Sequence, residues 1–339
     1  MPKTVNRGSG KIAAEFCRKH PDVPSRTLAR LLSEKHPQDF PTIERARATI
    51  RSVRGNNGKE QRKQITDKSL FRKNQKPFGI VLPKGHKQSK PPLHFEDEGK
   101  WLILSDLHIP YHDETAIEAA ILYGVKQGCQ HVVLNGDTLD FYQLSKFPKD
   151  PEKRKPEVEL KMCRRMMAEI AKHFPGKKLF KVGNHEERWQ SYLFERAEHM
   201  AGIKDFRLEK VLRLKSRGWE YIGGRQWYYL GHLAVIHGHE LKGDGRANSP
   251  VNMARTLFLK TAENALCGHG HRASTHIEST GMKKRITTCY STGCLCGLFP
   301  DYALINGWTQ GFAIVEVGKG GTWNVSNCTI TDGQVFRTE

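Results

Sequence analysis

The sequence lacks an apolar run of the roughly 18–20 residues needed to cross a bilayer, and no signal-peptide core stands near its start. We therefore expect a cytoplasmic protein that is neither secreted nor inserted in a membrane. Cysteine is sparse as well: eight thiols are scattered through 339 residues, without the density of a disulfide scaffold or the paired spacing of a zinc ribbon. We expect them to be reduced. For Cys294 and Cys296, packing is favoured over metal or redox use.

Acidic residues are few relative to basic ones. Asp and Glu number 36 against 55 Lys and Arg, which gives a formal charge of +19. The excess lies in the first third, because residues 1–92 hold 22 basic and 7 acidic side chains. An acidic partner such as nucleic acid is therefore the first to consider. The length and the 37% apolar content suit an ordinary globular protein of about two domains.

Three short helices are predicted in the basic third, at 11–19, 25–34 and 42–53, because each is bounded by proline, glycine or a capping residue. They predict a small helical, helix-turn-helix-like module over residues 1–58. Residues 59–94 are basic and poor in apolar side chains, and they are predicted to form a flexible linker.

The third of these helices carries two stripes. Its expected apolar face consists of Ile43, Ala46, Ile50 and Val53, which recur at helical spacing. Beside it, Arg47, Arg51 and Arg54 form a basic stripe. Such a surface neutralises phosphates, so we expect these arginines to bind nucleic acid without reading bases; a merely solvated basic face is the alternative.

From residue 95 onward, short apolar runs alternate with amphipathic stretches, which indicates an α/β layered domain. Strands are expected at 101–104, 131–134, 178–182, 233–236, 265–267, 286–290, 312–317 and 323–330. Helices are expected at 115–127, from Pro156, and from Ser249-Pro250. In the helix that begins at Pro156, one apolar stripe is expected, formed by Val158, Met162, Met166 and Ile170.

Five of these strands are followed directly by residues that bind metals. The segments are Ser105-Asp106-Leu107-His108, Asn135-Gly136-Asp137, Gly183-Asn184-His185-Glu186, His237-Gly238-His239 and Gly268-His269-Gly270-His271. Sites in α/β sheets assemble at the carboxyl ends of strands, so these groups are expected to converge. Two carboxylates, an amide and four imidazoles suit Mn²⁺, Fe or Zn²⁺ better than Ca²⁺, and seven ligands suit two ions that share a carboxylate. The flanking glycines are expected to let the backbone turn sharply.

With these motifs in this order, residues 101–317 resemble the calcineurin-like metallophosphoesterase superfamily. Within the superfamily, the sequence is most similar to phage-type members, which it resembles also at residues 289–298 and 311–317. The resemblance implies a four-layer α-β-β-α sandwich over residues 95–339 with two divalent ions, Mn²⁺ first and Fe, Zn²⁺ or Mg²⁺ as alternatives. It implies that one ion is held by Asp106, His108 and His271, and the other by Asn184, His237 and His269. Asp137 would bridge them.

The resemblance also implies roles beside the ligands. His185 corresponds to the catalytic histidine that faces the leaving-group oxygen. Asp140 either orients a neighbouring histidine or caps a helix. His239 is expected to support a ligand or contact substrate rather than serve structure alone. The phosphate-clamping arginines of the protein phosphatases are absent, because Val182 and Asp140-Phe141-Tyr142 occupy their places; Arg188 is the candidate substitute, with a solvated helix position as the alternative.

Three functions follow from these expectations. The first is a phosphodiesterase or nuclease that acts on nucleic acid and is tethered to it by the basic third. The second is a phosphomonoesterase for protein or small-molecule substrates. The third is a nucleic-acid-binding protein whose metal centre is not catalytic, which the intact ligand set disfavours.

Overall fold

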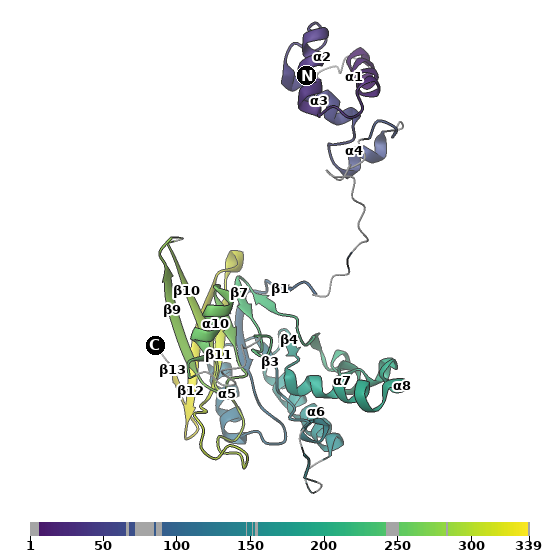
Figure 1. The fold of residues 1–339 in the computed structure, drawn as a ribbon. Coiled ribbons are helices and arrows are strands. Elements are labelled where there is room, and N and C mark those ends of the chain that lie inside the picture. The colour runs from purple at the N-terminus through teal and green to yellow at the C-terminus, as the bar shows by residue number, and fades with distance from the viewer. Residues whose placement is uncertain are drawn as a thin grey trace. The chain divides into compact units, whose positions relative to one another are not determined.

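The chain divides into two compact units, Met1–His86 and Lys87–Glu339, and each is described by itself (Figure 1). The computed structural model describes residues 7–65, 68–71, 85, 90–146, 148–150, 152, 155–241, 251–282 and 284–337. None of the helices in these ranges is both long and apolar enough to span a bilayer. All eight cysteines are free and buried.

The first unit contains the three predicted helices. They are α1 (Arg7–Lys19), α2 (Ser25–Lys35) and α3 (Ile43–Val53). Thr42 caps α3, because its hydroxyl accepts a hydrogen bond from the Arg45 N–H at 3.2 Å. A fourth, short helix, α4 (Lys59–Gln64), lies where the sequence predicted linker. Within α3, Ala46 and Ile50 are buried as expected and Val53 is partly buried, but Ile43 is exposed at the first helical position.

Arg54 corrects the predicted basic stripe. Its side chain is only 1% exposed, and it stands after α3 has ended. The guanidinium donates hydrogen bonds to the carbonyls of His20, Pro21 and Val23 and to the hydroxyl of Ser25. Arg54 therefore joins α3 to the turn between α1 and α2 and does not face a partner. Arg51 is exposed and Arg47 is partly exposed, so these two remain at the surface.

The second unit contains two sheets. The seven-stranded sheet has the order β13-β12-β11-β2-β3-β4-β5. Its strands are β2 (Gly99–Leu104), β3 (His131–Asn135), β4 (Lys178–Lys181), β5 (Trp219–Ile222), β11 (Gln310–Val317), β12 (Trp323–Thr331) and β13 (Gln334–Arg337). Strands β2 to β5 are parallel, whereas β11, β12 and β13 pair antiparallel.

The six-stranded sheet has the order β1-β6-β7-β8-β10-β9. Its strands are β1 (Leu93–Phe95), β6 (Tyr228–Leu230), β7 (Leu233–Val235), β8 (Ala265–Cys267), β9 (Ser274–Thr280) and β10 (Arg285–Ser291). The parallel pairs β7–β8 and β8–β10 place the carboxyl ends of β7 and β8 side by side. The expected strands are all present, and β1, β5, β6, β9 and β13 are additional.

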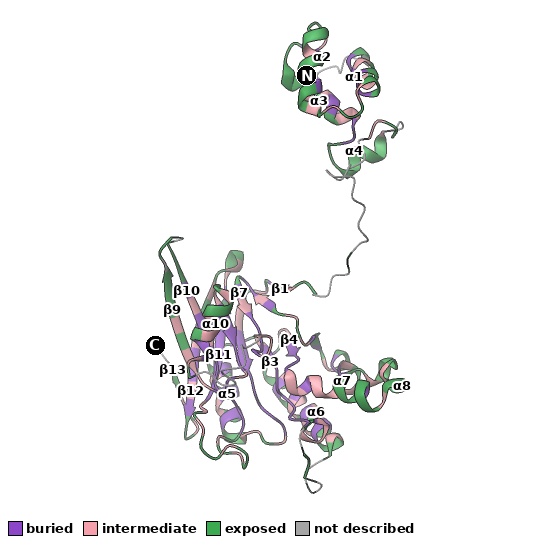
Figure 2. Ribbon diagram, in the orientation of Figure 1, coloured by how far each residue is buried: buried purple, intermediate pink, exposed green. Residues whose placement is uncertain are grey.

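The helices complete four layers. An apolar core lies between the sheets, with Trp101 and Val133 from one sheet against Leu230 and Val235 from the other. On the outer face of the seven-stranded sheet pack α5 (Glu114–Lys126) and α6 (Pro156–His173). On the outer face of the six-stranded sheet packs α10 (Met253–Thr261). The α-β-β-α sandwich is therefore confirmed, with buried strands inside and more exposed helices outside (Figure 2). The start predicted for the last helix, at Ser249-Pro250, lies outside the described residues.

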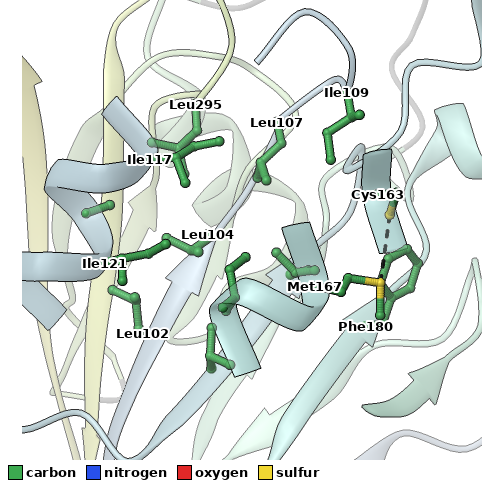
Figure 3. Packing of buried hydrophobic residues seen from close by; sticks show 14 of the residues in the cluster. Leu102, Leu104, Leu107, Ile109, Ile117, Ile121, Cys163, Met167, Phe180 and Leu295 are labelled. Carbon is green, nitrogen blue, oxygen red and sulfur yellow. Dashed lines mark hydrogen bonds between the residues drawn. The ribbon is translucent and has the colours of Figure 1, made fainter. Parts of the chain in front are cut away.

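The buried face of α6 differs from the predicted stripe. It consists of Leu160, Cys163, Met167 and Ile170, and the Cys163 thiol lies 3.8 Å from the Met167 sulfur (Figure 3). Spacings of three, four and three keep these side chains on one face, whereas steps of four drift by about 40° each around a helix of 3.6 residues per turn. Val158 is consequently 40% exposed, and only Ile170 of the predicted stripe is fully buried.

Short helices connect the remaining strands. They are α7 (Asn184–Arg196), α8 (Glu198–Ala201) and α9 (Leu208–Val211), with 3-10 turns at Tyr142–Leu144, Lys204–Phe206, Lys215–Arg217 and Lys319–Gly321. Helix α7 begins directly after β4, so the motif that follows that strand forms the first turn of a helix.

Candidate metal centre

The structure brings the five predicted motifs to one place. Strands β2, β3 and β4 end beside one another in the seven-stranded sheet, and β7 and β8 end beside one another in the six-stranded sheet. The site therefore lies where the ends of both sheets meet. The expected convergence is confirmed for Asp106, His108, Asp137, His237 and the His269/His271 pair by the distances between their side chains.

Asp106 is at the centre of one group of imidazoles. Its Oδ1 lies 3.3 Å from His271 Nε2 and 4.0 Å from both His108 Nε2 and His237 Nε2. The Nε2 atoms of His108 and His271 are themselves 3.1 Å apart. Ligand atoms about 2.0–2.2 Å from one ion are separated from one another by distances of this order.

Asp137 is at the centre of a second group. Its Oδ2 lies 3.2 Å from His237 Nε2 and 4.0 Å from His269 Nδ1 and His108 Nε2. Among the residues that the structure describes, three sets of side chains could each hold an ion. Asp137 belongs to two of them, one with His237 and His269 and one with His108 and His185. The third set consists of His108, His271 and Cys296. The carboxylate of Asp137 therefore faces both sides of the site.

The unpartnered atoms fit a cation. Asp106 Oδ2 accepts hydrogen bonds from Ser105 Oγ at 2.6 Å and His269 N at 2.9 Å, while its buried Oδ1 has no hydrogen-bond partner. Asn184 Oδ1 and His237 Nε2 are likewise buried without one. Native proteins rarely leave buried polar atoms unpaired, and Asp106 Oδ1 and His237 Nε2 lie 4.0 Å apart, so these two atoms point to an ion or water between them. The residues present therefore fit a divalent metal.

The charges agree with this fit. Burial lowers the pKa of His237, but Asp137 and Asp106 outweigh burial and raise that pKa to about 10. Burial raises the pKa of Asp106, yet the charges of His237 and His271 leave it below its ordinary value. Both carboxylates thus stay ionised and favour positive charge between them.

The ligands themselves adopt the strained backbone. Positive φ occurs at Asp106, His108, Asp137, His269 and His271. Of the flanking glycines, Gly136 has φ +91°, whereas the backbone of Gly183 is extended. Gly183 instead lets the backbone lie close to Asp137, because a Cβ at this position would be 2.2 Å from Asp137 Oδ1. The expectation that all the flanking glycines provide sharp turns is therefore wrong at Gly183. Strain at five of the candidate ligands indicates a functional site, since non-glycine residues rarely adopt this conformation.

His185 and Arg188 lie beside the ligands on α7. His185 Nδ1 is 3.1 Å from Asp140 Oδ1 and 2.9 Å from the Asp140 carbonyl, and its Nε2 is 3.9 Å from Asp137 Oδ2. Asp140 Oδ1 is also 3.2 Å from His108 Nδ1. Arg188 donates to the Asp140 carbonyl at 2.8 Å and places Nη2 3.1 Å from His185 Nε2. Asp140 thus contacts two imidazoles of the site, and it does not cap a helix.

His239 lies next to two ligands. Its ring centroid is 5.4 Å from that of His237 and 6.4 Å from that of His269. Its side chain is buried between Glu187, at 3.5 Å from Nε2, and Glu240, at 3.4 Å from Nδ1. This position is compatible with support of the ligands.

Two buried carboxylates that hold the ligand loops were missed by sequence reasoning. Glu186 accepts the backbone N–H groups of Asp137, Leu139 and Gly183 at 2.8–2.9 Å. Glu240 accepts the Gly238 N–H at 2.8 Å and lies 2.9 Å from the buried Lys181 ammonium. Glu186 belongs to the Gly-Asn-His-Glu segment, so its place in that motif was the available signal. For Glu240 there was no signal, because its partner Lys181 is distant in sequence.

Comparisons with known proteins give distant similarities. No family model matches the chain. It is 24% identical over 230 residues to the Gene 54 protein of Mycobacterium phage L5, which covers 64% of this chain and 88% of that protein. Similar solved structures include Zn²⁺-complexed Vps29 from Entamoeba histolytica (13% identity, TM-score 0.36, 70% of this chain and 97% of that one). Another is YfcE, a phosphoesterase from E. coli, with 17% sequence identity and a TM-score of 0.31. The match covers 66% of this chain and 96% of that one.

The chain's resemblance to calcineurin-like metallophosphoesterases extends from the motif series to the fold. The observed four layers are those that the resemblance implies, and the ligand-type side chains stand at the expected strand ends.

Proposed function

We propose that this protein is a metal-dependent phosphodiesterase or nuclease that acts on nucleic acid through a two-metal centre. The observation that carries the proposal is the position of Asp137, whose carboxylate lies within ligand distance of imidazoles on both sides. Asp106, His108 and His271 would hold one ion and Asn184, His237 and His269 the other. Divalent ions bound there, Mn²⁺ first and Fe, Zn²⁺ or Mg²⁺ as alternatives, would supply positive charge to the phosphoryl oxygens and would activate water as the nucleophile.

Residues of the chain itself would protonate the leaving group and bind the phosphoryl oxygens. Burial lowers the pKa of His185, but the charge of Asp137 and the hydrogen bond with Asp140 outweigh burial and leave that pKa above its ordinary value. Asp140 contacts Nδ1 and leaves Nε2 directed at the site, where Arg188 lies 3.1 Å from it; once Arg188 binds a phosphoryl oxygen instead, Nε2 would carry the proton that is donated to the departing oxygen. Arg188, whose guanidinium reaches Nε2, would bind a phosphoryl oxygen from the same side.

The nucleic-acid part of the proposal rests on charge. Residues 1–92 carry 22 basic and 7 acidic side chains, and Arg47 and Arg51 are at the surface of the first unit. Such a surface attracts phosphate backbones by releasing counterions. A reducing compartment such as the cytoplasm fits the eight free, buried thiols.

The proposal is tested by turnover of bis(p-nitrophenyl) phosphate and p-nitrophenyl phosphate with Mn²⁺, Fe²⁺, Zn²⁺ or Mg²⁺. We expect the diester to be preferred, and Asp137→Asn to lose roughly 10³-fold or more in kcat and to retain less metal by elemental analysis. Circular dichroism checks that the variant is folded. Preference for the monoester would support the phosphomonoesterase alternative. No turnover with any metal would contradict the proposal and favour a non-catalytic, nucleic-acid-binding centre.

A further inference from the structure

A cavity of about 310 Å³ adjoins the metal centre, and its walls are unusually aromatic. His108 and Asp140 form the side next to the ligands. Five of its twelve lining residues are Phe, Trp or Tyr, whereas these types make up 9% of the chain. They are Tyr111, Tyr142, Phe299, Tyr302 and Trp308. The volume is at the lower end of the range for small-molecule sites.

Two of the aromatic rings are packed edge to face beside the proposed metal centre. The Trp308 ring packs edge-on against His271 with centroids 4.2 Å apart, so the indole is held against a proposed ligand. Tyr302 lies next, with its centroid 6.3 Å from that of Trp308. Phe299 and Tyr302 are 71% and 77% exposed. Large apolar side chains gathered at the mouth of a cavity, where they gain little from packing, mark a ligand surface.

The charge of the walls selects the kind of ligand. The described residues that line the cavity include the carboxylates of Asp140 and Asp301 and no Lys or Arg. A second phosphate is therefore not what these walls attract, whereas a neutral planar group is well suited to stack on them. The group must also be attached to the phosphate at the metal centre, because the cavity opens on His108 and Asp140.

We propose that this cavity binds the nucleobase next to the scissile phosphate, so that the substrate is a nucleotide whose base is unpaired, at a strand end or in a single strand. This proposal rests on the proposed function and names its substrate class. A base in a duplex is stacked between its neighbours, so only an unstacked base can enter the cavity and contact its aromatic walls.

The test compares two ligands that differ only in the base. Full-length protein with Mn²⁺ is titrated by calorimetry with 2′-deoxyadenosine 5′-monophosphate and with 2-deoxyribose 5-phosphate. We expect the nucleotide to bind roughly 10-fold or more tightly, which is within the range for stacking of one base. The double variant Phe299→Ala/Tyr302→Ala should lose this preference while its affinity for the sugar phosphate stays unchanged. Both side chains are mostly exposed, so the variant should fold.

Phe336→Ala is the matched control, because Phe336 is an exposed aromatic on β13 outside the cavity, and it should keep the preference. Equal affinities in the wild type, no binding of either compound, or a preference that survives in the double variant would each overturn the proposal. Turnover of bis(p-nitrophenyl) phosphate is measured in parallel. Turnover without a base preference would contradict only the proposed base site. A base preference without turnover would contradict the proposed hydrolase activity and would leave the base site supported.

Discussion

Asp140 is the residue that couples the two histidines of different expected role. Its Oδ1 lies 3.2 Å from Nδ1 of His108, a proposed ligand, and 3.1 Å from Nδ1 of His185, the proposed acid. A carboxylate on one ring nitrogen fixes the tautomer and directs the other nitrogen outward. One side chain therefore orients both a proposed metal ligand and the proposed proton donor.

His185→Gln should separate these two roles. We expect kcat to fall by roughly 10²–10⁴ for a diester with an alkyl leaving group, because such an oxygen needs a proton. The fall should be much smaller for a p-nitrophenolate leaving group, which is stable as an anion. The measurement is kcat for both substrates in wild type and variant.

Metal content is the control for this variant, since His185 is not among the proposed ligands. It should equal that of the wild type by elemental analysis. An equal loss with both leaving groups, or a loss of metal, would contradict the role of His185 as an acid.

Glu159 provides a pH-dependent contribution to stability. Burial raises the pKa of this carboxyl to about 7, and Asp140 adds to the rise, although the Phe141 N–H donates to it at 2.6 Å. Because the folded pKa lies above the unfolded value of 4.5, stability is fully present below about pH 4.5 and is lost as pH rises through 7. Glu159→Gln keeps an acceptor without a charge. We expect the wild type to lose up to about 3 kcal/mol more than the variant between pH 4.5 and 8.

Urea unfolding with a chelator at several pH values checks this expectation. The chelator removes the metals, and the difference between wild type and variant cancels the other titrating groups. Parallel pH profiles for the two proteins would show that Glu159 does not titrate in this window.

At the residue scale, the sequence predicted which polar side chains converge at the strand ends, but it did not predict the residues that support them. Asp106 and His271 were recognisable because each follows an apolar strand, and strand ends of one sheet necessarily lie together. Glu240 was not, because its use depends on Lys181, which only the tertiary fold brings near. Arg54 was placed wrongly, because helical phase says nothing about a residue that stands beyond the end of the helix.

At the scale of elements, α6 shows how packing selects one face. Met167 is fully buried among the residues drawn in Figure 3, whereas Val158 lies near the helix start and is partly solvated. Met167→Ala should lower the free energy of unfolding by about 2–5 kcal/mol, the cost of a large-to-small change in a core. Val158→Ala should cost less than about 1 kcal/mol. Urea unfolding of both variants at one pH measures the difference.

The two variants bear on different descriptions of the helix. The predicted stripe made Val158 a core residue and left out Met167. If the two variants lost equal free energy of unfolding, the result would support the stripe with steps of four. A much larger loss for Met167→Ala would support the face that the structure shows.

Strands differed in how far the sequence revealed them. Central strands such as β2 and β3 are buried on both faces, so they read as continuous apolar runs. Strand β9 escaped prediction because it pairs with β10 alone and its side chains are largely exposed. Strands β1, β6 and β13 are three or four residues long and owe their pairing to neighbours distant in sequence.

At the scale of the whole molecule, charge is divided unequally along the chain. The first 92 residues carry 22 basic and 7 acidic side chains, whereas the remaining 247 residues carry 33 and 29. A unit close to neutral that contains the candidate metal centre thus follows a strongly basic segment. This division predicts that retention of nucleic acid depends on salt and on the first unit, while the chemistry depends on the second.

Arg47→Glu/Arg51→Glu tests this division directly. Both side chains reach the surface of α3, so their reversal should leave the fold intact and weaken binding of labelled single-stranded DNA, with a salt slope reduced by about 2. Fluorescence anisotropy at several salt concentrations measures the slope. The control is Lys126→Glu/Lys319→Glu, an equal change of charge at exposed sites of the second unit. If the control weakened binding as much, attraction would follow from net charge alone; if only the α3 variant did, and turnover of bis(p-nitrophenyl) phosphate stayed unchanged, the first unit would hold the strand while the second cleaves it.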